Sequence, residues 1–205
     1  MSVLPAMGVA ITGTSLITGR LSADVVPTLA REAPTFPECL GPVAIFNLGH
    51  GGWTSTDILA SLPTIIALQP GFVFIDTGSI NDCFDSGSGP QVSLVTHDVN
   101  LTSIITGLQT GVPGVDLTVM TMSPVSTSIA AGRPLLATFY AHDLSVAAGL
   151  SIRTMDNYAG WVNPLPDALT YDLDGLHPIW AGAVETYLYP NLKAGLRARM
   201  TEFWT

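Results

Sequence analysis

Five short apolar runs, spaced along the whole chain, are the feature that most limits its fold. They cover residues 9–12, 43–47, 72–77, 117–122 and 150–156. Nearly continuous runs of this kind are typical of strands buried on both faces of a parallel sheet. The intervening segments are long enough to contain crossover helices. The sequence therefore predicts an α/β domain with a central, mostly parallel five-stranded sheet.

Helical segments are predicted between these runs. A helix capped by Thr54 or Ser55 should extend to residue 68, and Pro63 inside it should kink or divide it. The other predicted helices cover residues 97–108, 135–148 and 179–200, the first of them with Val99 and Ile104 on one face. Right-handed crossovers would place helices on both faces of the sheet and give a three-layer α/β/α sandwich.

Composition and charge exclude several classes of protein. A chain of 205 residues suits a single domain, residues 1–205, and 47% hydrophobic against 11% charged residues argues against disorder. A net charge of -9 with seven Lys and Arg offers no basic surface for nucleic acid. No apolar run reaches the roughly 18 residues of a membrane span, and the first ten residues lack a signal peptide's charged region. We expect a cytoplasmic protein, a mature form, or a domain of a larger or exported protein.

The two cysteines, Cys39 and Cys83, leave two possibilities open. They could form a disulfide if both lie near the same edge of the sheet, or they could be free thiols. No cluster of cysteines and histidines has metal-ligand spacing, so no metal site is predicted.

Four short polar motifs occur in order along the chain. Residues 13–15 (Gly-Thr-Ser), 47–52 (Asn-Leu-Gly-His-Gly-Gly) and 79–82 (Ser-Ile-Asn-Asp) each follow an apolar run, and 174–178 (Asp-Gly-Leu-His-Pro) lie near the C-terminus. Open α/β sheets bind ligands at the edge where the carboxyl ends of their strands meet. We therefore expect the motifs to lie close together at that edge.

Asp174 and His177 are three residues apart, a spacing at which a carboxylate in a turn can reach the Nδ1 proton of the imidazole. Such a contact fixes the tautomer and leaves Nε2 able to take a proton from a hydroxyl. Ser15 could supply that hydroxyl if the fold brings the two ends of the chain together.

In this order the four motifs resemble those of the SGNH hydrolases, the GDSL esterase and lipase family, over nearly the whole chain. The resemblance implies a flavodoxin-like sandwich and a catalytic triad of Ser15, Asp174 and His177. It further implies that Gly52 and Asn81, with the Ser15 backbone N–H, form an oxyanion hole. No cofactor is implied.

Two positions depart from the family pattern. Thr14 stands where the first motif usually has Asp, which affects support of the loop more than the nucleophile. Ser79 stands where the third motif usually has Gly, so the backbone near Asn81 is expected to differ from the family pattern.

Each motif also has a simpler interpretation. Ser15 could cap a helix, Gly52 and Asn81 could belong to turns, and His177 could cap the helix that Pro178 begins. We favour the catalytic interpretation because the simpler ones would all have to hold together in the family's order. His50, two residues before Gly52, is expected to be structural, although it could line the pocket.

Three other classes of protein share features with this sequence. An ordinary α/β-hydrolase is disfavoured because no Gly-x-Ser-x-Gly follows a predicted strand. A flavodoxin-like nucleotide or flavin binder would need a phosphate-binding loop after the first strand, which residues 12–15 match only in part. A catalytically silent carbohydrate-binding or structural module on the same fold remains the alternative to an enzyme.

The expected function is hydrolysis of carboxylic esters through an acyl-enzyme, with short acyl chains such as acetyl esters on carbohydrates as substrates. The partner is then a small-molecule or carbohydrate ester, and the oligomeric state stays open. The segments expected to form the pocket are Trp53, Phe84 with residues 85–90, residues 126–133, and residues 158–165.

Overall fold

A parallel sheet forms the centre of the computed structural model, which describes residues 6–18, 25–161, 175–178, 184–185 and 188–205. The strand order is β2-β1-β3-β4-β5, and all four pairings are parallel. The predicted five-stranded sheet is therefore confirmed. The strands are β1 (Met7–Gly13), β2 (Val43–Gly49), β3 (Phe72–Asp76), β4 (Asp116–Thr121) and β5 (Arg153–Asp156).

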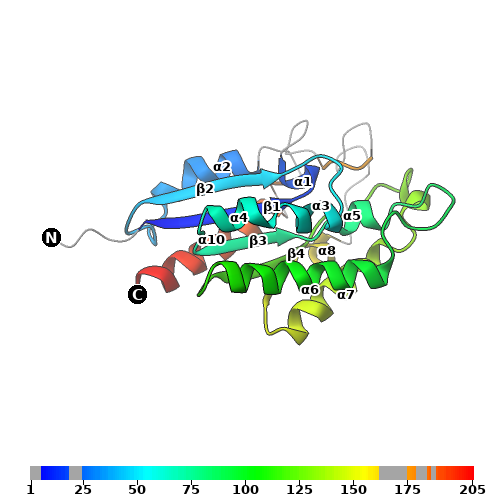
Figure 1. Cartoon of the computed structure of the whole chain (residues 1–205). Helices are drawn as coiled ribbons and strands as arrows, with labels where there is room; N and C mark the ends of the chain where they lie inside the picture. Colours follow the sequence, from blue (N-terminus) through cyan, green and yellow to red (C-terminus); the bar gives the residue numbers. More distant parts are fainter. Residues whose placement is uncertain (1–5, 19–24, 162–174, 179–183, 186–187) are drawn as a thin grey trace.

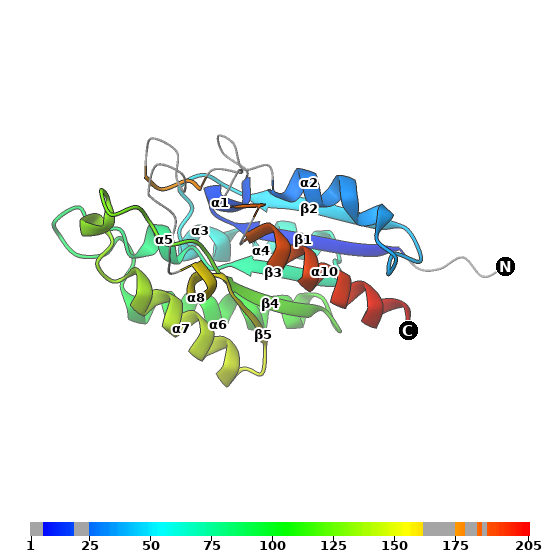
Figure 2. The same ribbon diagram turned by 180° about the vertical axis from the view of Figure 1, so that it is seen from behind.

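Helices cover both faces of this sheet, as Figures 1 and 2 show from opposite sides. One face is covered by α3 (Ser55–Ala60), α4 (Leu62–Ala67) and α6 (Leu94–Gly111), and the other by α2 (Val25–Glu32) and α10 (Tyr189–Trp204). The remaining described helices are α1 (Ser15–Thr18), η1 (Ala33–Thr35), α5 (Ser79–Asp82), η2 (Ala130–Gly132), α7 (Leu136–Gly149) and α8 (Asn157–Trp161). The arrangement is the predicted three-layer sandwich.

The central strands divide the core into two layers. Val9 and Ile11 of β1 pack into one cluster with α2 and α10, while Ala10 between them packs with α3, α4 and α6. Phe74 of β3 belongs to the first cluster and Ile75 to the second. The alternation follows from the two-residue period of a strand, which sends successive side chains to opposite faces.

The prediction that all five strands are buried on both faces is wrong for the two at the edges. Strand β2 is only partly buried, and three of the four residues of β5 are exposed. An edge strand has a neighbouring strand on one side only, so more of its surface is exposed.

The predicted helix through Pro63 is divided into α3 and α4, which meet at Ser61. Thr54 caps α3 in a reciprocal arrangement with Asp57, so the predicted start is confirmed. On α6, Ile104 is buried as expected, but Val99 is 59% exposed and the predicted face is wrong there.

The structure also bears on the C-terminal helix, the two cysteines and the hydropathy of the helices. Part of the helix predicted at 179–200 lies outside them, and α10 begins at Tyr189. Cys39 and Cys83 are free thiols rather than a disulfide. No described helix combines the length and the hydropathy needed to cross a bilayer.

The carboxyl ends of β1, β2 and β3 point to the same end of the molecule (Figure 1). The first two polar motifs begin in the last residues of β1 and β2, and the third follows β3. The sheet topology therefore gathers them at one edge, as predicted from the order of the runs.

Candidate active site

Ser15 begins α1 directly after β1, and His177 lies in the short described segment 175–178. The Oγ atom of Ser15 and the Nε2 atom of His177 are 2.8 Å apart, although the two residues are separated by 162 positions in the chain. Both side chains are buried, with exposures of 4% and 2%. The fold therefore brings together the two residues predicted to be nucleophile and base.

The turn that carries His177 is attached to a loop after β4. The backbone N–H of Ser126 donates to the carbonyl of Gly175 over 2.9 Å. Residues 126–133, predicted to form part of the pocket, thus begin beside the His177 turn. Asp174 lies outside the described residues, so its place as the third member of a triad stays a prediction.

Thr14, the first departure from the family pattern, is hydrogen-bonded to the buried carboxyl group of Asp76. Its hydroxyl and its backbone N–H both donate to Oδ2 of Asp76, over 2.6 and 2.9 Å. Burial raises the pKa of Asp76, and the hydrogen bonds from Thr14 lower it, with a net value of about 6. A carboxylate at position 14 would face that of Asp76, whereas the threonine hydroxyl donates to it.

The loop that contains Gly52 lies beside the nucleophile. The N–H of His50 donates to the carbonyl of Gly13 over 2.9 Å, which joins this loop to the end of β1. A β-carbon added to Gly51 would lie 4.0 Å from that of Ser15. Gly52 has a φ of 78°, in the left-handed region where glycine is favoured, so the chain turns sharply at this point.

Asn81 lies in α5, after β3, and its side chain is 8% exposed. Its Nδ2 atom donates to the carbonyl of Trp53 over 2.7 Å, so the third motif is joined to the loop of the second. An amide nitrogen carries two N–H groups. The bond to Trp53 uses one and fixes the direction of the other.

A buried cluster that the sequence did not predict lies next to Asn81. The Nδ1 atom of His97 is 2.7 Å from Oδ2 of Asp82, and its Nε2 atom is 2.7 Å from Oδ1 of Asp143. All three side chains have 0% exposure. Burial lowers the pKa of His97, but hydrogen bonds to Asp143 and Asp82 outweigh it and raise the value to about 9. His97 is therefore an imidazolium at neutral pH.

No local signal in the sequence marks this cluster. Asp82 and Asp143 lie 15 and 46 positions from His97, and His97 has no carboxylate at the i−3 position that singled out His177. Only the packing of α5, α6 and α7 brings the three residues together.

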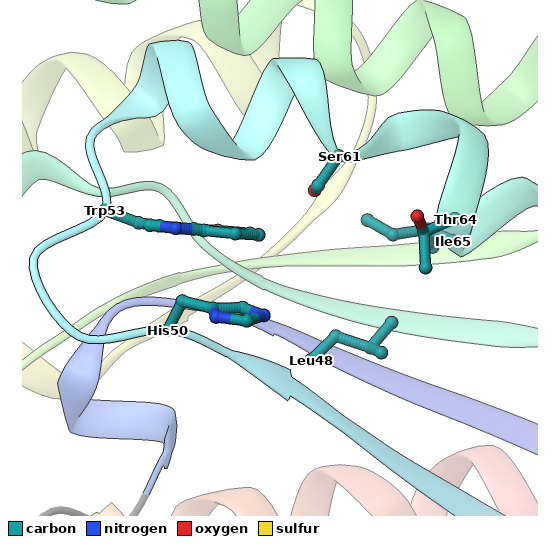
Figure 3. Close-up of a pocket in the computed structure, with 6 residues that line it drawn as sticks. All are labelled: Leu48, His50, Trp53, Ser61, Thr64 and Ile65. Atoms are coloured by element: carbon teal, nitrogen blue, oxygen red, sulfur yellow. The ribbon is translucent and has the colours of Figure 1, made fainter.

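A pocket of about 90 Å³ lies between the end of β2 and helices α3 and α4. Figure 3 shows the residues that line it. The rings of His50 and Trp53 stack in its lining, with centroids 3.8 Å apart and planes at 13°. Both residues line this pocket, and their place in a substrate pocket at Ser15 stays a prediction. Leu48, Ser61, Thr64 and Ile65 complete the lining, which includes neither Ser15 nor His177.

Two other segments predicted to form the pocket, Phe84 and residues 85–90, are held by specific contacts. Phe84 carries the guanidinium of Arg133 over its ring, 4.9 Å from the centroid. The glycine-rich residues 85–90 form a loop in which Asp85 accepts the N–H groups of Gly87 and Gly89. Residues 158–165 extend beyond the part that the structure describes. Among the described side chains, no group of three His, Cys, Asp or Glu residues is arranged to hold a metal ion.

Comparison with solved structures identifies the fold. A lipase/acylhydrolase from Enterococcus faecalis matches with a TM-score of 0.77 and 20% identity, over 94% of this chain and 96% of that one. An acetylxylan esterase from Geobacillus stearothermophilus matches with a TM-score of 0.72 and 17% identity, over 98% and 96%. No family model and no curated protein matches the sequence. The structural similarity confirms the fold that the resemblance to SGNH hydrolases predicted.

Proposed function

We propose that this chain belongs to the SGNH hydrolases and is a serine hydrolase of carboxylic esters. The observation that carries the proposal is the 2.8 Å contact between Ser15 Oγ and His177 Nε2 at the carboxyl edge of a parallel sheet. A serine hydroxyl is a poor nucleophile until a base removes its proton. His177 is the base, and Asp174 accepts a hydrogen bond from its Nδ1–H, which orients the ring.

Attack of Ser15 Oγ on the ester carbonyl forms a bond to carbon and moves an electron pair onto the carbonyl oxygen. His177 takes the hydroxyl proton. The oxyanion accepts hydrogen bonds from the backbone N–H groups of Ser15 and Gly52 and from the second amide N–H of Asn81. Each such donor typically contributes about 3 kcal/mol to transition-state stability.

The tetrahedral intermediate collapses when His177 gives its proton to the leaving alcohol. This step leaves an acyl group on Ser15. Water, activated by the same imidazole, then attacks the acyl-enzyme, and the acid is released by a second collapse. The mechanism requires no cofactor.

We propose short acyl esters, such as acetyl groups on carbohydrates, as the substrates. One structural neighbour is an acetylxylan esterase, and its catalytic variants replace a Ser, an Asp and a His. The Asp and His of that enzyme are three positions apart, as Asp174 and His177 are here. The stacked His50 and Trp53 rings beside the Ser15 loop are consistent with a sugar on the alcohol side.

The test is hydrolysis of p-nitrophenyl esters of increasing chain length, followed by release of acetate from acetylated xylo-oligosaccharides. We expect the acetyl ester to be the best of the series and Ser15→Ala to abolish turnover. Ser123→Ala is the matched control: Ser123 is also buried, and among the described residues its hydroxyl has no hydrogen-bond partner. A wild-type protein that hydrolyses none of these esters would support the silent-module alternative instead.

A further inference from the structure

The Asp82–His97–Asp143 cluster is not used by the proposed chemistry, yet it is completely buried. Burying charged groups costs free energy unless each is paired and hydrogen-bonded. Here the His97 ring lies between two carboxyl groups, and burial raises the pKa of one of them, Asp143. Apolar side chains could fill the same volume without this cost, so the burial of three ionisable groups here needs a physical explanation.

The contacts of Asp82 lead directly to the loop of the second motif. Its Oδ1 atom accepts the N–H of Ser55 over 2.8 Å, at the first residue of α3. The preceding residue in the chain, Asn81, donates to the carbonyl of Trp53. Two adjacent residues of α5 therefore bind two backbone groups at the start of α3, and together they fix how Asn81 is directed.

Asp143 fixes the other end of α5. Its Oδ2 atom accepts hydrogen bonds from the hydroxyls of Ser79 and Thr77, over 2.6 and 2.8 Å. Both residues lie between the end of β3 and Asn81. Ser79, the second departure from the family pattern, thus supplies a hydroxyl to this cluster.

Gly78 shows how closely these elements approach. A β-carbon at this position would lie 2.7 Å from the N atom of Ser55, and the residue has a φ of 85°. The turn before α5 and the start of α3 are in direct backbone contact, so a small shift of either would redirect the Asn81 amide.

We propose that Asp82, His97 and Asp143 are positioning residues that hold the Asn81 side chain in the direction required for an oxyanion donor. His97 acts as the link, because each of its two ring N–H groups donates to one carboxylate. This inference rests on the proposed function, in which Asn81 stabilises the oxyanion.

The test is a double-mutant cycle between His97→Gln and Asn81→Ala, measured as kcat and KM on a short-chain ester. In the wild-type background His97→Gln should lower kcat about tenfold with little change in KM, since coupled neighbours typically interact on this scale. In the Asn81→Ala background the same substitution should cost less than about twofold, because the amide it positions is already absent.

The chain offers a matched control in His142→Gln. His142 and Asp98 form a second His–Asp contact of 3.0 Å between α7 and α6, next in sequence to Asp143 and His97, but their side chains are 41% and 32% exposed. This variant should leave kcat unchanged. A purely structural role for His97 would give the same loss in both backgrounds, and that result overturns the proposal, as does a loss confined to KM.

If His97→Gln does not fold, Ser79→Ala takes its place in the cycle. It removes the hydroxyl that donates to Asp143 and lies 3.3 Å from His97 Nε2, and it leaves both carboxylate contacts of His97 in place. The same criterion then applies to it. Ser15→Ala separates the two claims. Activity that survives Ser15→Ala contradicts the proposed function, whereas an inactive Ser15→Ala with an additive cycle contradicts only the positioning role.

Discussion

His177 and His97 lie near the same edge of the sheet but in opposite chemical surroundings. Nε2 of His177 faces the hydroxyl of Ser15, whereas both ring nitrogens of His97 face carboxylates. Despite burial, the hydrogen bonds to Asp143 and Asp82 raise the pKa of His97 to about 9, and a ring with a proton on each nitrogen has no lone pair to accept another. An imidazole nitrogen beside a hydroxyl can accept one. Both histidines are buried, so burial does not distinguish them. The groups that face their ring nitrogens decide which one can act as a base.

The largest expected effect distinguishes the two histidines by activity. His177→Ala should lower kcat/KM by about 10⁴ or more, because the base of a serine hydrolase acts as a unit with its nucleophile. Asp174→Asn should cost less, since some correctly oriented imidazole survives without the carboxylate. Steady-state kinetics on an acetyl ester measure both, and circular dichroism checks the fold. A His177→Ala variant within tenfold of wild type would remove His177 from the mechanism.

The next effect concerns the oxyanion. Asn81→Ala should lower kcat by about 10² to 10³, the usual cost of one oxyanion-hole donor, and leave KM nearly unchanged. The amide donates to an oxygen that carries full charge only in the transition state, so its loss should not affect ground-state binding. An increase in KM with unchanged kcat would instead make Asn81 a substrate-binding residue.

The third prediction uses the charge of His97. Its folded pKa of about 9 lies above the ordinary value of 6.5, so the stabilisation is complete below pH 6.5 and is lost as the pH rises through 9. Over that interval the free energy of unfolding should fall by about 3 kcal/mol. Urea unfolding at several pH values measures it, and His97→Gln should remove most of this dependence. If the free energy of unfolding falls equally with pH in the wild type and in His97→Gln, a cationic His97 is contradicted.

The smallest effect is at Thr14. Thr14→Val should lower the free energy of unfolding by about 1–2 kcal/mol, because the buried Asp76 carboxyl loses one of its hydrogen-bond donors. Thr14→Ser keeps the hydroxyl and serves as the control. Urea unfolding of the two variants side by side gives the difference, and equal stability would mean that the hydroxyl contributes little.

The sequence predicted the central strands of the sheet well because each is a local apolar run. The central strands contain such runs on both faces, and the five predicted segments correspond to β1 to β5. The prediction was wrong at the edges: β5 has a neighbouring strand on one side only, and its polar residues Arg153, Thr154 and Asp156 are exposed. Pro63 and Thr54 marked helix boundaries correctly because their effects are local.

The candidate site was predictable where its residues occur in short motifs. Ser15 and His177 could be paired from the order of the motifs, and the structure places their side chains in contact. Asp82 and Asp143 could not be assigned to His97, since three different elements bring them together. The role of Thr14 was also hidden, because its partner Asp76 lies 62 positions away.

The most direct test of the central claim is covalent labelling with a fluorophosphonate, which reacts with the nucleophile of serine hydrolases. Intact-mass and peptide analysis should show one adduct per chain, on Ser15, with none in Ser15→Ala and much slower labelling in His177→Ala. Normal labelling in His97→Gln would show that the second histidine does not activate the serine. An adduct on another residue, or ester hydrolysis that continues without any adduct, would contradict Ser15 as the nucleophile activated by His177.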